Sequence, residues 1–70
     1  MNIDHLVKMA NEISLFYVSD APNDAAKSIA SHLTRFWEPR MRKAIIEYNS
    51  QGGGGLKESV RAALTLLTTK

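Results

Sequence analysis

The chain has 70 residues, no cysteine, and nine Lys and Arg against seven Asp and Glu, for a formal net charge of +2. One small, marginally stable domain fits this length, and the lack of cysteine excludes disulfides, thiolate zinc sites and cysteine-ligated iron–sulfur clusters. The weak positive balance disfavours a dedicated nucleic-acid binder. No apolar run reaches the roughly 20 residues that span a bilayer. Because the start also lacks the apolar stretch of a secretory signal, we expect a cytoplasmic protein that is stabilised by a partner.

The first segment has apolar residues at helical spacing, which predicts a helix over residues 3–19. Its stripe comprises Ile3, Leu6, Val7, Ala10, Ile13 and Tyr17. Met9 and Phe16 are expected to widen this stripe, whereas Leu15 lies outside it. Pro22 then ends the segment, because a residue before proline favours an extended backbone.

Two prolines mark the starts of the next two predicted helices, over 23–37 and 39–49. A helix tolerates proline in its first turn, where the missing N–H has no partner in any case. The stripe of the second helix is Ala26, Ile29, Ala30, Leu33, Phe36 and Trp37, and that of the third is Met41, Ala44, Ile45 and Tyr48. Both aromatic residues are therefore expected to pack in the core, where the two helices meet at Pro39.

Four consecutive glycines end the third helix and predict a flexible loop over residues 50–55. A phosphate-binding loop is disfavoured, because a helix precedes the glycines and a leucine stands where lysine should follow. The last predicted helix, 57–68, carries Leu56, Val60, Ala63, Leu64 and Leu67 at helical spacing. We therefore predict one all-α domain over 1–70, a small compact bundle of four helices with a proline-marked corner and a glycine-rich loop.

Residues for catalysis or metal binding do not form any recognisable pattern. The only histidines, His5 and His32, lack the spacing of a metal motif. The carboxylates are scattered, and the serines lack a nucleophile motif. We therefore predict no catalytic, cofactor-binding or metal-binding residue in this chain.

Positive charge gathers at the proline-marked corner, because four of the nine basic residues fall within 35–43. If the stripe of the third helix faces the core, Arg42 and Ile46 point away from it. Arg and Trp are enriched at protein interface hot spots, whereas nucleic-acid binding needs aromatic rings that are free to stack. We therefore favour protein docking over nucleic-acid binding, through Arg35, Trp37, Glu38, Arg40, Arg42 and Ile46. Self-association of the isolated chain through Leu15, Ile46 or Leu66 stays open, since these lie off or at the edge of their stripes.

Three stretches of the sequence carry a family resemblance: "LVKMANEI" at 6–13, "HLTRFWEPRMRKAI" at 32–45 and "GGGGL" at 52–56. In this order and spacing, they resemble the delta subunit of the soluble NAD-dependent, molybdenum-containing formate dehydrogenases. Besides the arginines and Glu38, the signature residues are Met9, Ala10, Asn11, Phe36, Trp37, Pro39 and Met41. Lys57 and Glu58 depart from the Ser-Pro pair that the resemblance leads us to expect.

The resemblance implies a non-catalytic accessory subunit of a multisubunit oxidoreductase. In such a complex the large subunit carries the molybdenum–pterin centre and iron–sulfur clusters, and companion subunits carry FMN and the NAD site. The partners implied are these subunits, and this chain is expected to bind none of the cofactors itself. An integral subunit and a transient factor for molybdenum-cofactor insertion both agree with the sequence.

Overall fold

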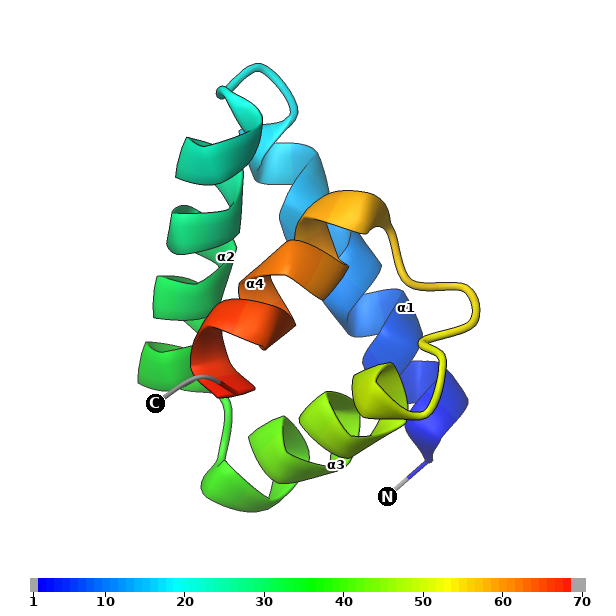
Figure 1. Ribbon diagram of the computed structural model, residues 1–70. Coiled ribbons are helices and arrows are strands. Elements are labelled where there is room, and N and C mark those ends of the chain that lie inside the picture. The colour runs from blue at the N-terminus through cyan, green and yellow to red at the C-terminus, as the bar shows by residue number, and fades with distance from the viewer. Residues whose placement is uncertain (1, 69–70) are drawn as a thin grey trace.

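A computed structural model of the chain describes residues 2–68 and shows a compact helical bundle, 30 × 24 × 22 Å in extent (Figure 1). The elements in chain order are α1 (Ile3–Ser14), the short 3-10 helix η1 (Leu15–Tyr17), α2 (Pro22–Phe36), α3 (Pro39–Ser50) and α4 (Glu58–Thr68). Helix α4 packs most extensively on α2, and α3 contacts both α1 and α4. The predicted all-α fold is confirmed, and the described residues include no strand.

The helix starts follow from local chemistry. The side chain of Asn2 caps α1 by accepting a hydrogen bond of 2.8 Å from the backbone N–H of Asp4. Pro22 and Pro39 are the first residues of α2 and α3, as predicted. No side chain caps the start of either helix, so proline is the main local signal for where they begin.

The first helix ends sooner than the predicted residue 19, because its last turn tightens into η1. A 3-10 helix has three residues per turn instead of 3.6, so the apolar stripe loses its phase there. Tyr17 still packs against the core, but Phe16 is 80% exposed. The prediction that Phe16 widens the core-facing stripe was therefore wrong.

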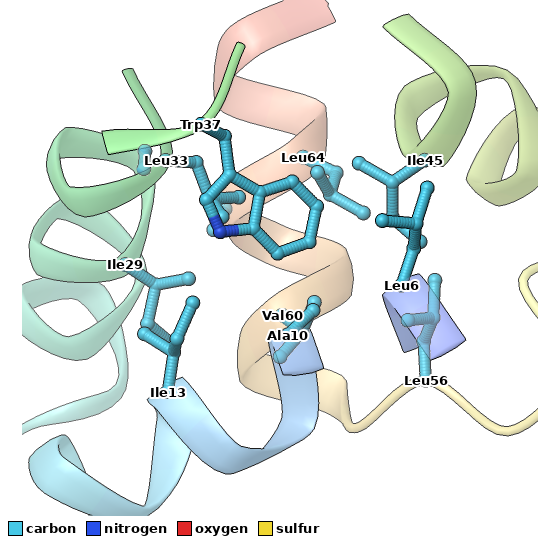
Figure 2. Packing of buried hydrophobic residues seen from close by; sticks show 12 residues of the cluster. Leu6, Ala10, Ile13, Ile29, Leu33, Trp37, Ile45, Leu56, Val60 and Leu64 are labelled. Atoms are coloured by element: carbon cyan, nitrogen blue, oxygen red, sulfur yellow. The ribbon is translucent and has the colours of Figure 1, made fainter. Parts of the chain in front are cut away.

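The core lies where all four helices meet, and Figure 2 shows the indole of Trp37 pointing into the middle of it. Its largest fully buried side chains are Ile29, Leu33, Ile45, Leu64 and Val60. Trp37 itself is 6% exposed, as expected from the stripe of the second helix. This core holds together the ends of α2 and α3 that form the proline-marked corner.

The neighbouring aromatic residue has the opposite environment. Phe36 is the last residue of α2 and is 72% exposed, so its predicted place in the core was wrong. The physical reason is that Phe36 follows His32 by one helical turn and lies against its ring on the solvent side of α2, with ring centroids 4.8 Å apart. The backbone leaves the helix only at Trp37 (φ −91°, ψ 141°), whose indole points into the core.

The glycine-rich loop begins with a Schellman motif at the end of α3. The backbone N–H of Gly52 donates to the carbonyl of Asn49 (3.2 Å), and that of Gly53 donates to the carbonyl of Tyr48 (3.1 Å). Gly52 and Gly53 have φ of +125° and +63°, the left-handed region that glycine enters without a steric cost. Two of the four glycines are thus required by the way α3 ends.

Side chains from two helices then hold the rest of the loop. The amide of Asn11 donates to the carbonyl of Gly55 (2.9 Å) and accepts from the backbone N–H of Lys57 (3.0 Å). The hydroxyl of Tyr48 donates to the carbonyl of Gly54 (2.6 Å). Asn11 therefore ties α1 to the start of α4, which places Leu56 in the core.

Gly53→Ala is expected to lower the free energy of unfolding by about 1 to 2 kcal/mol, the cost of a left-handed backbone for an L residue. A Cβ at Gly53 would also lie 2.9 Å from Oδ1 of Asn49, the atom that accepts a hydrogen bond from Nε of Arg61. Gly54→Ala is the matched control, because Gly54 has no positive φ and its Cβ would meet only the Tyr48 hydroxyl, at 3.5 Å. Urea titration followed by circular dichroism measures both, and equal losses would contradict the assignment.

Candidate docking surface

The predicted docking residues lie around the corner between α2 and α3, but they differ in exposure. Arg35, Glu38 and Arg40 are exposed. Trp37 is buried, and Arg42 and Ile46 are half-buried. The six residues therefore separate into an outer group that faces solvent and an inner group that makes contacts within the fold.

Arg42 caps the end of α2. Its guanidinium Nη1 donates to the carbonyls of Leu33 (3.3 Å), Thr34 (3.2 Å) and Trp37. The last carbonyls of a helix lack partners within the helix and carry partial negative charge, so a cation stabilises this end. Arg42 was expected to point away from the core side of α3; the structure shows that it reaches back to α2 instead.

Ile46 was also expected to point away, and this orientation is wrong. Both Ile46 and Met41 are half-buried and pack against the core cluster. The reason is that α3 contacts α1 and α4 together, so its contact side is broader than the single stripe read from the sequence. Ile46 thus stabilises the bundle, as Met41 does.

The outer group lies within residues 35–40, which also include the exposed ring of Phe36. We use "basic corner" for Arg35, Phe36, Glu38 and Arg40, all of which are exposed. Glu38 is the N-cap residue of α3, and its side chain makes no capping hydrogen bond. Arg40 lies in the first turn of α3, where the helix dipole disfavours positive charge. The positive charge of Arg40 therefore does not stabilise α3, and the fold gives no reason for an arginine at this position.

The other signature residues have structural roles. Ala10 is fully buried between helices, Met9 packs against the core from a half-buried position, and Pro39 starts α3. Asn11 makes the two loop contacts described above, which sequence reasoning did not predict. No local pattern signals them, because the partners lie 44 and 46 residues further along the chain.

Residues 2–68 contain neither a metal-ligand cluster nor a membrane-spanning helix. No group of three or more His, Asp or Glu side chains in this part of the chain is placed to hold a metal ion. None of the helices described has the length and apolar character needed to cross a membrane.

Comparison with known proteins identifies the family. No curated protein and no solved structure matches the chain. A family model does match: it is described as the NADH-dependent formate dehydrogenase delta subunit FdsD and covers residues 5–64. The matched range includes α1 from its first turn, the whole basic corner, the glycine-rich loop and most of α4. This chain therefore belongs to the FdsD family, the delta subunits of NADH-dependent formate dehydrogenase.

Proposed function

We propose that this chain is a non-catalytic accessory subunit that docks on the larger subunits of a cytoplasmic formate dehydrogenase and stabilises the assembled enzyme. Family membership over residues 5–64 supports the association with that enzyme. In this proposal the molybdenum–pterin centre, the iron–sulfur clusters, FMN and the NAD site belong to the other subunits, and the large molybdenum-containing subunit is the main partner. The chain itself would bind none of these groups.

The observation that carries the proposal is the basic corner. Residues 35–40 hold a phenylalanine that is 72% exposed and three exposed charged side chains, and they also include the buried Trp37. Neither Phe36 nor Arg40 stabilises the fold by burial, and both are residue types that protein interfaces use. Arg35 and Arg40 each offer a planar fork for a carboxylate or carbonyl of the partner. Trp37, Arg42 and Ile46 would support this surface from inside.

Co-purification tests the proposal. A tagged wild-type chain, expressed in its native cells, should retain the large molybdenum-containing subunit near one-to-one, with formate-dependent reduction of NAD in the eluate. Arg40→Glu should lower the amount retained by about tenfold, because reversing a charge at an interface typically costs 1 to 2 kcal/mol of binding energy. The matched control is Lys8→Glu, which reverses an exposed charge on α1 and should leave retention unchanged.

Two outcomes would count against the proposal. If the wild-type chain retains neither subunits nor activity, the accessory role is wrong. If it retains only a large subunit that is inactive and lacks its cofactor, the chain acts as a transient maturation factor instead. Equal retention by Arg40→Glu and the wild type would contradict the role of the basic corner alone.

A further inference from the structure

A second feature shares Arg35 and Phe36 with the basic corner, and the proposed function does not use its other lining residues. An open cleft of about 320 Å³ lies between η1 and α2. Tyr17, Lys27, His32, Arg35 and Phe36 line it, together with two serines. None of these seven lining residues carries a carboxylate, so the cleft combines aromatic rings with two fixed positive charges.

The two cations are not neutralised within the described part of the chain. Over residues 2–68 the structure records no hydrogen bond or ion pair of the Lys27 or Arg35 side chains. Both side chains are exposed, whereas Tyr17 and His32 are half-buried. The tilted contact between His32 and Phe36 keeps the phenylalanine ring at the edge of the cleft. The cleft therefore presents aromatic rings and serine hydroxyls, with a positive charge toward each end.

We propose that this cleft binds an acidic, extended segment of a partner subunit of the formate dehydrogenase. The inference rests on the proposed docking function and adds the chemistry of the segment that is bound. Lys27 and Arg35 would each pair with a carboxylate of the segment. Between them, the aromatic rings of the cleft would contact an apolar side chain. An extended segment can run along α2 and direct alternate side chains at the cleft.

Helix geometry gives the spacing of the segment. Lys27 and Arg35 are eight residues apart on α2, which separates them by about 12 Å along the axis. An extended chain covers this distance in about four residues, and its side chains alternate between two faces. The first, third and fifth residues of such a segment would face the cleft. The expected pattern is thus acidic–x–apolar–x–acidic, with the third residue against Tyr17 and His32.

Charge reversal tests the pairing of the two cations with carboxylates. The double variant Lys27→Glu with Arg35→Glu should lower retention of the large subunit by about tenfold or more, since each reversed contact costs roughly 1 kcal/mol or more. The matched control, Lys8→Glu with Lys57→Glu, changes the net charge equally at two exposed residues that do not line the cleft. It should retain the wild-type amount. Circular dichroism should show the same helical content for both variants.

Photo-cross-linking identifies what occupies the cleft. Ser31 lines the cleft and is exposed, so Ser31→p-benzoylphenylalanine in the co-purified complex should cross-link to a segment of a partner subunit with the acidic and apolar pattern above. The same group at Thr65, an exposed position on α4 outside the cleft, should not label that segment. A cross-link to a segment without carboxylates, to nucleic acid or to a second copy of this chain would overturn the inference.

The two proposals fail in different ways. If the wild-type chain does not co-purify with the enzyme, the docking function fails and the cleft has no partner. If the wild type co-purifies and the double variant is retained equally well, the assignment of the cleft fails and so does the contact proposed for Arg35, while the docking function and the role of Arg40 stand. Loss of retention in the double variant but not in its control, with the expected cross-link, supports both.

Discussion

Replacing Trp37 by alanine is expected to lower the free energy of unfolding of the isolated chain by about 3 to 5 kcal/mol, whereas replacing the adjacent Phe36 by alanine should leave it nearly unchanged. Removing a buried tryptophan typically costs 3 to 5 kcal/mol, from lost burial and from the cavity that remains. A chain of this length has a total stability of only about 4 to 10 kcal/mol. Both substitutions remove an aromatic side chain, but Trp37 is 6% exposed and Phe36 is 72% exposed. The expected difference in stability therefore comes from burial.

Thermal unfolding followed by circular dichroism measures this pair. Phe36→Ala should change the free energy of unfolding by about 0.5 kcal/mol or less, as surface substitutions do. If that variant lost as much stability as Trp37→Ala, the arrangement of the corner described here would be wrong. Because Phe36 belongs to the basic corner, a stable Phe36→Ala protein is also suitable for co-purification with the enzyme.

The positions of the helices could be predicted from the sequence because their signals are local. Pro22 and Pro39 mark two helix starts, and the apolar stripes place most of the buried residues, including Ile29, Leu33 and Ile45. Such stripes work where the backbone stays helical and one side faces the core. The all-α fold follows from these signals alone.

The predictions that were wrong lie where the helical phase changes, at a helix end, or where a helix has two neighbours. Phe16 falls in η1, where the helical phase changes, and Phe36 is the last residue of α2, where its ring lies against His32 instead of the core. Ile46 lies on a helix that packs against both α1 and α4. Spacing along a sequence carries no information about how many neighbours a helix will have, so this kind of burial requires the tertiary structure.

For the candidate site, the sequence could indicate the exposed charges but not the polar contacts within the fold. A cluster of arginines beside aromatic residues is visible at 35–42. That Arg42 donates to carbonyls of α2, while Arg40 does not, depends on which side of α3 faces the corner. The cleft between η1 and α2 is equally invisible in the sequence, because Tyr17 and the α2 residues come together only after folding.

Arg42→Ala is expected to lower the free energy of unfolding by about 2 to 3 kcal/mol, the usual range for losing hydrogen bonds from a charged group. The guanidinium donates hydrogen bonds to three carbonyls at the end of α2. Its positive charge also interacts favourably with the negative end of the helix dipole. Arg42→Lys should lower the free energy of unfolding by less, because lysine keeps the positive charge. It should still lower it, because lysine lacks the planar set of donors of arginine. Chemical denaturation of the three proteins gives the order wild type, Lys variant, Ala variant.

Arg40→Ala is the matched control, two residues away in the same helix, and should change stability by about 0.5 kcal/mol or less because its side chain is exposed. A loss as large for Arg40 as for Arg42 would contradict the capping role. The different effects expected for Arg40→Ala and Arg42→Ala on stability also determine which arginine is suited to a docking test. A variant that changes both arginines would weaken binding by loosening the end of α2, which holds Arg35 and Phe36 in place. Of these two arginines, only Arg40 can be changed to test the surface charge without weakening the fold.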